Sequence, residues 1–197
     1  MSELRLLGPN DYRSMRWRNG GGVTAELASA PGAGGRFLWR VSIAEVAQSG
    51  PFSNFTGYDR IITLLSGEGM ALDFSGAAEP VRIADRLAPV PFSGDWATTC
   101  RLFGGPVRDF NVMVDRERAA AKVTALGSIP RAEWRNADGD ITLLYAIRGG
   151  FACHAEKSPI DRVPPGYSLL WTRDATAPVL RPGEDAEALL VEIFLRR

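Results

Sequence analysis

Short runs in which apolar and polar residues alternate predict that this chain consists almost entirely of β-strands. In residues 37–44 the odd-numbered positions are Phe, Trp, Val and Ile, and the even-numbered ones include Arg40 and Ser42. A period of two is typical of a strand whose two faces meet different surroundings. Further strands are predicted at 23–28, 60–65, 69–74, 81–83, 98–103, 109–114, 122–126, 141–147, 167–172 and 188–195.

Glycine, proline, aspartate and asparagine separate these short segments. Such spacing favours an antiparallel sandwich or barrel over a parallel sheet with crossover helices. Little helix is expected. One turn is predicted at 10–15, and another at 115–121 with Asp115 as its N-cap. The predicted fold class is all-β.

A coarse internal repeat suggests that the barrel is duplicated. Residues 62–69 resemble residues 144–151, because each is an apolar strand that ends in a glycine turn and continues as a second strand. A similar second element follows each of them after about twenty residues. We therefore predict an N-terminal barrel with the main pocket at 1–118, and a degenerate barrel packed on it at 119–197.

The bulk composition narrows the function classes. The 197 residues contain 23 basic and 23 acidic side chains, which argues against direct nucleic-acid binding. No apolar run approaches the roughly 18 residues of a membrane span. Cys100 and Cys153 belong to no Cys-x-x-Cys pair, and the N-terminus has no signal-like segment, so a reducing, cytoplasmic location is expected.

The segment 50–69 contains the strongest candidate for chemistry. It reads as an aromatic turn, then Arg60, an apolar strand and a Gly-x-Gly turn. The layout resembles that of the cupins, small β-barrels in which two histidines and a glutamate hold a metal. The corresponding places here are Asn54, Thr56 and Arg60. A cation in place of a carboxylate turns a metal site into a potential anion site.

An inward-facing Arg60 would need a partner, because an isolated buried charge is costly. The partner is either a protein carboxylate (Glu45, Asp95 or Asp109) or a bound anion, and a carboxylate can pair with arginine through two hydrogen bonds. Asp95, in a Gly-Asp turn, could orient Arg60, accept a hydrogen bond from a ligand or only stabilise the turn.

The strand at 109–114 adds further polar candidates. Alternation places Asp109 and Asn111 on one face and Phe110 and Val112 on the other. The polar face could border a partly wet cavity, where an amide both donates and accepts hydrogen bonds. Alternatively, Asp109 and Asn111 could only bond loop backbone.

Two other features of the sequence, a glycine run and a single histidine, do not indicate a functional site. Gly20–Gly22 lacks the Lys-Ser/Thr and the helix of a phosphate-binding loop, so we expect a glycine turn that passes close to another strand or over a pocket. His154 is the only histidine, so a histidine-rich metal site is not expected. No Gly-x-Ser-x-Gly elbow accompanies it, which argues against a serine hydrolase.

Five motifs occur in order through roughly the first 115 residues. They are Trp17 with Asn19-Gly20-Gly21-Gly22-Val23-Thr24 and Glu26, Trp39-Arg40-Val41-Ser42-Ile43-Ala44, Gly50-Pro51-Phe52-Ser53 with Asp59-Arg60, Phe92-Ser93-Gly94-Asp95, and Asp109-Phe110-Asn111-Val112-Met113. As a set they resemble the HutD/Ves family.

The resemblance implies a bicupin fold, with two RmlC-like jelly rolls, whose metal centre is altered or absent. The HutD branch is associated with bacterial histidine utilization, and the Ves branch with cold or environmental stress. The resemblance further implies a non-catalytic governor that senses or sequesters a formylated or formiminated glutamate, or urocanate. Arg60 carries the family's pocket arginine, and Phe52, Ser53, Asp109 and Asn111 match other characteristic positions.

The leading hypothesis is a non-catalytic protein that binds a small anionic metabolite and regulates histidine utilization. We expect no catalytic residue, metal, cofactor, membrane or direct nucleic-acid partner, and a homodimer is compatible with the sequence. The alternatives are a metal-free isomerase, epimerase or lyase with Glu45, Asp95 or Asp109 as general base beside Arg60, a metal-dependent oxygenase and a protein-interaction module. The candidate ligand-binding residues are Arg60, Asn111, Phe52, Asn54, Asp109, Trp39, Arg40 and Asp95.

Overall fold

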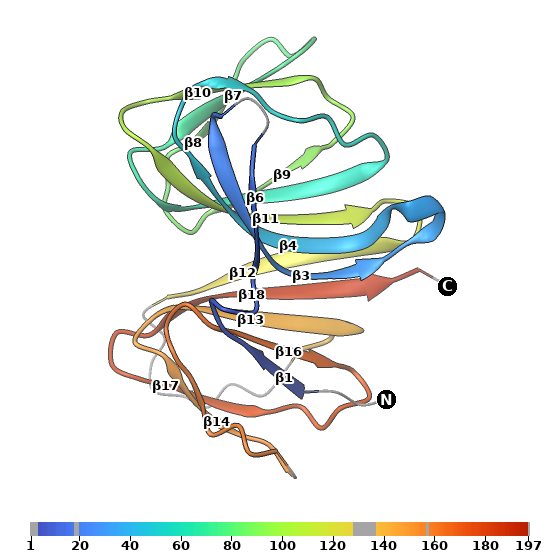
Figure 1. Ribbon diagram of the computed structural model, residues 1–197, viewed down its shortest axis with the longest axis vertical. Coiled ribbons are helices and arrows are strands. Elements are labelled where there is room, and N and C mark those ends of the chain that lie inside the picture. Colours follow the sequence, from blue (N-terminus) through green and yellow to red (C-terminus); the bar gives the residue numbers. More distant parts are fainter. Residues whose placement is uncertain (1–3, 18–19, 128–136, 157, 197) are drawn as a thin grey trace. The chain divides into compact units, whose positions relative to one another are not determined.

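The computed structural model describes residues 4–17, 20–127, 137–156 and 158–196, and within these ranges it contains strands and one 3-10 turn (Figure 1). The all-β prediction is confirmed. No helix of the described residues is long and apolar enough to cross a membrane. The elements are β1 (Leu4–Leu7), β2 (Arg13–Arg16), β3 (Gly22–Pro31), η1 (Ala33–Gly35), β4 (Phe37–Val46), β5 (Gly50–Pro51), β6 (Tyr58–Ser66), β7 (Met70–Phe74), β8 (Val81–Ile83), β9 (Pro89–Ser93), β10 (Thr98–Leu102), β11 (Val107–Asp115), β12 (Ala119–Gly127), β13 (Ile141–Arg148), β14 (Phe151–His154), β15 (Arg162–Val163), β16 (Ser168–Thr172), β17 (Val179–Pro182) and β18 (Glu187–Leu195).

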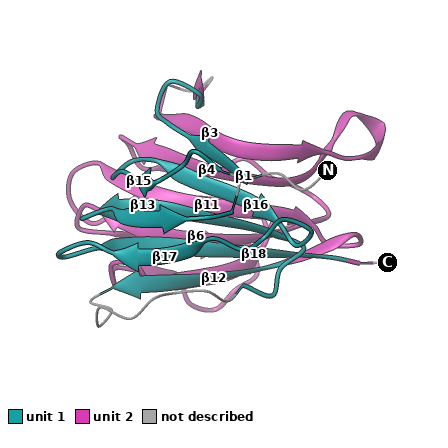
Figure 2. Ribbon diagram, turned by 90° about the horizontal axis from the view of Figure 1, so that it is seen from below, with its two compact units in different colours: residues 1–12, 121–195 teal, residues 13–120, 196–197 magenta. Residues whose placement is uncertain are grey.

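The chain forms two compact units, which Figure 2 colours separately. One contains residues 13–120 with 196–197, and the other contains residues 1–12 with 121–195. The sequence placed all of 1–118 in one barrel, but β1 pairs antiparallel with β16, with Leu4 opposite Trp171. Leu4 and Leu6 pack against the core of that second unit, which explains why the first strand belongs there.

The unit of residues 13–120 consists of two sheets around an apolar core. Its larger sheet has the order β2-β3-β4-β11-β6-β9, and its smaller sheet has the order β5-β10-β7-β8. Side chains of both sheets form one cluster: Ala44, Val46, Ile62 and Leu64 come from the larger sheet, and Met70, Leu72, Phe74 and Cys100 from the smaller. Burial of these apolar side chains provides the main stabilising contribution of the unit.

The second unit has the same plan, with sheets β1-β16-β13-β18-β12 and β15-β14-β17 around a core that includes Leu144, Phe151 and Trp171. In each unit a strand of the larger sheet, β6 or β13, continues through glycines into a strand of the smaller sheet, β7 or β14. Gly67, Gly69, Gly149 and Gly150 all have positive φ there. The predicted repeat at 62–69 and 144–151 therefore corresponds to equivalent sheet-to-sheet turns.

Three neighbouring strands of the larger sheet position the candidate site. β11 lies between β4 and β6 and is antiparallel to both. Met113 of β11 is opposite Arg40 on one side and Arg60 on the other. Arg40 and Arg60 therefore lie two strands apart, about 10 Å between their backbones.

Both predicted helical turns are wrong. Residues 8–12 form a turn and residues 13–16 form β2, which pairs with β3. β11 ends at Asp115, and a turn connects it to β12, with Arg118 N donating to Asp115 O at 3.0 Å. Asp115 does accept from a backbone N–H two residues later, at 3.1 Å, but it stabilises a hairpin turn rather than a helix. The polar residues that suggested a cap fit either structure.

Candidate functional site

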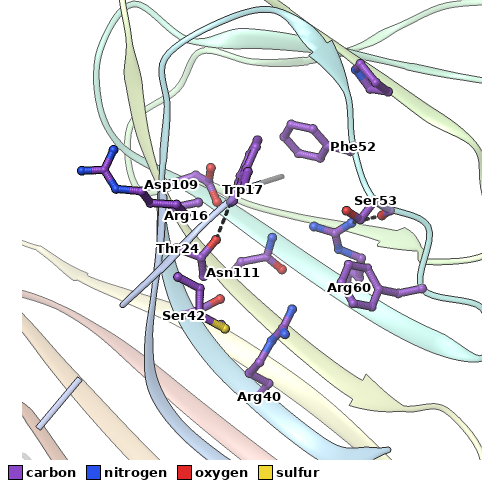
Figure 3. Close-up of a pocket in the computed structure, with 14 residues that line it drawn as sticks. Arg16, Trp17, Thr24, Arg40, Ser42, Phe52, Ser53, Arg60, Asp109 and Asn111 are labelled. Carbon is purple, nitrogen blue, oxygen red and sulfur yellow. Dashed lines mark hydrogen bonds between the residues drawn. The ribbon is translucent and has the colours of Figure 1, made fainter. Parts of the chain in front are cut away.

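A cavity of about 570 Å³ lies inside the unit of residues 13–120 (Figure 3). Its volume falls in the range of small-molecule sites. The lining combines two buried or half-buried arginines with aromatic rings and several hydrogen-bonding groups. The lining residues are Met15, Arg16, Trp17, Thr24, Arg40, Ser42, Ala44, Pro51, Phe52, Ser53, Phe55, Arg60, Asp109 and Asn111.

Arg60 is only 6% exposed, and its guanidinium faces the cavity. It makes no ion pair with a described residue; Nη1 donates weakly to Ser53 O at 3.4 Å, and Nε has no hydrogen-bond partner. Its Cζ instead lies 4.8 Å from the ring centre of Phe92 and 5.4 Å from that of Phe55. Burial lowers the pKa of Arg60 from 12.5 to about 10, the Asp109 carboxyl opposes this change, and Arg40 adds to it. Arg60 is therefore a cation at neutral pH, without a contacting counter-ion among the described residues.

Arg40 provides a second guanidinium on the same face of the sheet. Its Cζ lies 4.7 Å from the ring centre of Phe37 and 5.2 Å from that of Phe55, so Phe55 contacts both cations. Nη2 lies 3.2 Å from Met113 Sδ, and the buried Nε has no hydrogen-bond partner. Burial lowers the pKa of Arg40, which makes a bound anion favourable beside it.

Asp109 lies four residues before Met113 on the same face of β11, and it is 1% exposed. Neither carboxyl oxygen accepts a hydrogen bond in the described structure. Burial raises the pKa of Asp109 from 3.8 to about 7, and the nearby Arg60 opposes the increase. The cavity therefore contains a carboxyl group that titrates near neutral pH.

Asn111 lies between Asp109 and Met113, opposite Ser42 of β4, and its buried Oδ1 has no partner. In Figure 3 the guanidinium groups of Arg40 and Arg60 point toward the space beside Asn111. Trp17 and Phe52 form another part of the wall, with ring centres 6.0 Å apart at nearly perpendicular planes. Trp17 Nε1 donates to Thr24 Oγ1 at 2.8 Å, which fixes the indole at the cavity.

Five of the eight candidate residues from the sequence line this cavity: Arg40, Phe52, Arg60, Asp109 and Asn111. Trp39 does not, because it is on β4 next to Arg40 and successive side chains of a strand point to opposite faces. It is buried on the other face at 5% exposure. Asn54 is exposed and borders a separate depression near Thr98 and Thr99.

Asp95 also lies outside the cavity, because it belongs to an ion-pair cluster. Its Oδ1 accepts from Gly57 N at 2.6 Å, and its Oδ2 lies 2.6 Å from Arg116 Nη1. These contacts lower the pKa of Asp95 to about 2. Arg116 also pairs with Asp59, so the cluster ties the β5–β6 segment to the turn after β11. Glu45 pairs with Arg108 at 3.6 Å, which leaves Asp109 as the carboxylate of the described cavity lining.

Several lining residues were not predicted. Ser42 and Ala44 could have been found, because they share the even-numbered face of β4 with Arg40. Trp17 and Thr24 belong to the first motif and Phe55 to the predicted aromatic turn, but alternation does not direct them to the cavity, because this depends on how β3, β4, β11 and β6 pair. The predicted glycine turn does pass close to another strand, because a Cβ atom added to Gly22 would lie only 2.4 Å from Glu45 O of β4. Asn19, which precedes these glycines in the first motif, lies outside the described residues.

The donor set does not fit the metal centre that cupin-type folds commonly hold. Three arginines, Arg40, Arg60 and the exposed Arg16, line the same space as the single carboxylate of the described lining, and cationic side chains repel a metal ion. The chain's only histidine, His154, belongs to β14 of the other unit. No group of three histidine, cysteine or acidic side chains in the described residues could hold a metal. The lining suits an anion better than a cation.

A family model named HutD matches residues 9–187. The chain belongs to the HutD family. Protein Ves of Citrobacter koseri is 41% identical over 181 residues, covering 84% of this chain and 91% of that protein. An uncharacterised 21.2 kDa protein from the hutC 3′ region of Pseudomonas putida is 45% identical over 125 residues; this match covers 62% of this chain and 64% of that relative, less than two thirds of its length.

Solved structures also support the assignment of this chain to the HutD family. HutD from Pseudomonas fluorescens SBW25, determined in a formate condition, has a TM-score of 0.83 at 30% identity and covers 99% of this chain and 100% of its own. A conserved protein of unknown function from Pseudomonas aeruginosa PAO1 has a TM-score of 0.84 at 35% identity, and the match covers 98% of this chain and 100% of that one. A cupin 2 barrel protein from Leptotrichia buccalis has a TM-score of 0.55 at 9% identity, with 93% and 96% coverage, and shows the cupin-type fold alone.

Proposed function

We propose that this HutD-family protein binds a small carboxylate metabolite in the cavity and acts as a non-catalytic sensor. The observation that carries the proposal is the pair of guanidinium groups, Arg40 and Arg60, that face one cavity without a contacting carboxylate among the described residues. Desolvated cations gain more from an incoming anion than cations already in an ion pair. A carboxylate could accept from both guanidiniums while Phe52 and Trp17 cover its apolar part.

The proposed pathway is histidine utilization. It is supported by the HutD family match and by the Pseudomonas putida relative, whose name places it in the hutC 3′ region. The candidate ligands are N-formylglutamate, N-formiminoglutamate and urocanate. Through such a ligand the protein would report the level of a degradation intermediate and regulate the pathway.

Isothermal titration calorimetry of the three candidates tests the anchor. We expect Arg60→Met to abolish measurable binding and to retain the fold, because methionine keeps much of the apolar stem without a buried charge. Arg82→Met is the matched control, since Arg82 is an exposed arginine whose Cζ lies 4.3 Å from the ring centre of Phe103. Equal affinities of wild type and Arg60→Met would refute the anchor. In cells, R60M and a deletion of the gene should change growth on histidine in the same way.

One observation favours a second candidate function, a metal-free isomerase, epimerase or lyase. Asp109 is buried at the cavity with its pKa raised to about 7, which suits a general base at neutral pH, and Arg60 could polarise a carbonyl or carboxylate. NMR of the candidate ligands with micromolar protein over several hours distinguishes the two functions. Conversion by wild type that Asp109→Asn abolishes would establish the enzyme, whereas unchanged spectra would leave binding alone.

A further inference from the structure

We propose that Arg116 is a positioning residue of the binding site, and that it holds the ring of Phe55 against the guanidinium groups of Arg40 and Arg60. The inference rests on the proposed function, because it concerns the same cavity, although Arg116 itself does not line that cavity. It also gives a role to the sequence motif at 92–95, none of whose residues belongs to the lining.

The first support is the place of Phe55 in the site. In the described part of the chain, Phe55 is the ring that contacts both guanidiniums: the Cζ atoms of Arg40 and Arg60 lie 5.2 and 5.4 Å from its centre. The attraction between a cation and a ring face is strongest where both are desolvated, and Arg60 is only 6% exposed. A displaced Phe55 would leave both cations better hydrated and less fixed, and both changes weaken the binding of an anion.

The second support is that the backbone docks Phe55 onto Gly94. Phe55 N donates to Gly94 O at 2.9 Å, Gly94 N donates to Tyr58 O at 2.8 Å, and Tyr58 N donates to Phe55 O at 3.1 Å. A Cβ atom added to Gly94 would lie only 2.4 Å from Phe55 O, so this close approach requires glycine. The position of the ring therefore depends on how the turn at 55–58 sits on the turn that contains Gly94.

The third support is that the side chain of Arg116 fastens these two turns together. Nε donates to Asp59 Oδ1 at 2.5 Å, and Nη1 donates to Asp95 Oδ2 at 2.6 Å. Nη2 donates to Ser93 Oγ at 2.7 Å and to Tyr58 O at 3.0 Å. A planar guanidinium directs several N–H groups at once in fixed directions, which the ammonium group of lysine does not reproduce.

Each residue of the motif at 92–95 takes part in this arrangement. The ring centre of Phe92 lies 4.8 Å from Cζ of Arg60, Gly94 receives the turn, and the residues on either side of Gly94 bind Arg116. The side chains of the Arg116 ion pairs are between 37% and 48% exposed, and exposed ion pairs contribute little to folding stability. Positioning of the turn explains the four directed contacts better than a contribution to stability does.

Calorimetry with N-formylglutamate, N-formiminoglutamate and urocanate tests the effect on binding. Arg116→Lys keeps the charge and the hydrogen bond from the backbone N of residue 116 to Gly57 O at 3.0 Å, but it loses the forked contacts. We expect this variant to raise the Kd about 5- to 50-fold. Arg118→Lys is the matched control and should bind as wild type does, because Arg118 lies in the same turn and pairs with Asp115 at 3.7 Å rather than with the turn at 55–58.

Fluorine NMR of 4-fluorophenylalanine at position 55 observes the ring directly and needs no ligand. The wild-type background should give one sharp resonance, and Arg116→Lys should shift or broaden it, because the ring then samples more than one position. Arg118→Lys should leave the resonance unchanged. A purely structural role of Arg116 would lower the unfolding temperature, but it would change neither the resonance of the folded protein nor its affinity.

The inference requires both changes. Folded Arg116→Lys with a Kd within about twofold of wild type, or with an unchanged fluorine resonance, would overturn it. If that variant does not fold, Asp95→Asn takes its place under the same two criteria, because it removes the charged acceptor of Arg116 with almost no change in size.

The same measurements separate this inference from the proposed function. If wild type binds a candidate ligand and Arg60→Met abolishes binding while Arg116→Lys does not weaken it, the anion site stands and the positioning role is wrong. If wild type binds none of the three compounds but Arg116→Lys changes the fluorine resonance, the positioning of Phe55 stands and the proposed function fails for these ligands.

Discussion

Because the pKa of Asp109 is raised in the folded state, the stability of the ligand-free protein should depend on pH. In the unfolded chain this carboxyl should titrate near its ordinary value of 3.8, whereas in the folded protein burial raises the pKa to about 7. The folded state therefore holds the proton more tightly. Asp109 contributes stability that is complete below pH 4 and is lost as the pH rises through 7. Asp109→Asn removes the titration with almost no change in size.

The structure gives the size of the effect. The difference between 3.8 and about 7, at 1.36 kcal/mol per pH unit, corresponds to about 4 kcal/mol. The free energy of unfolding of Asp109→Asn minus that of wild type should therefore increase by up to about 4 kcal/mol between pH 4 and pH 8. Urea denaturation followed by tryptophan fluorescence at four or five pH values measures this difference. The contributions of the other titrating groups cancel, because they are common to the variant and the wild type.

Asp73→Asn is the control, because Asp73 is an exposed carboxylate on β7 of the same unit. Its difference from wild type should stay nearly constant over the same pH range. A difference for Asp109→Asn that is equal at pH 5 and pH 8 would refute the reasoning. It would mean that a donor or cation satisfies the ionised carboxylate in solution.

Three further predictions concern the scaffold. Gly67→Ala should lower the free energy of unfolding by at least about 2 kcal/mol in urea denaturation, because φ is +101° and a Cβ would lie 2.7 Å from Pro106 O. Gly76→Ala is the control, since φ is +87° there but the space around it is open, and it should lower the free energy of unfolding by only about 1 kcal/mol. Burial raises the pKa of Cys100 to about 12, so its thiol should react with a disulfide reagent only after unfolding, and a rapid reaction in the native protein would contradict this. Phe110→Ala should cost about 3–5 kcal/mol in the same denaturation assay, since Phe110 is fully buried, whereas a change below 1 kcal/mol would show that the site repacks.

The sequence predicted the parts of the site that depend on local alternation. The period of two in β11 correctly placed Asp109 and Asn111 on one face, and the same rule applies to Arg40 and Ser42 in β4. It also shows why Trp39 and Arg40 could not both line one cavity. That conflict was visible in the sequence, because the two residues are adjacent in a strand.

Other features depend on contacts between distant segments, which alternation does not describe. β1 joins the sheet of the second unit through its pairing with β16, more than 160 residues later in the chain. Asp95 was a reasonable partner for Arg60 in sequence, but Arg116 and the Gly57 N–H bind it instead. The two wrong helical turns, at 10–15 and 115–121, are short polar segments in which turn and helix start share the same residue preferences.

The position of Phe55 has a consequence for how this protein could report its ligand. The ring lies in the segment between β5 and β6 and touches two guanidiniums, whose Cζ atoms are 5.2 and 5.4 Å from its centre. A shift of that segment would change the hydration of both cations together. If an anion binds at the proposed site, its occupancy would be thermodynamically linked to the conformation of the segment between β5 and β6, and a partner that contacts this segment would respond to the metabolite without entering the cavity.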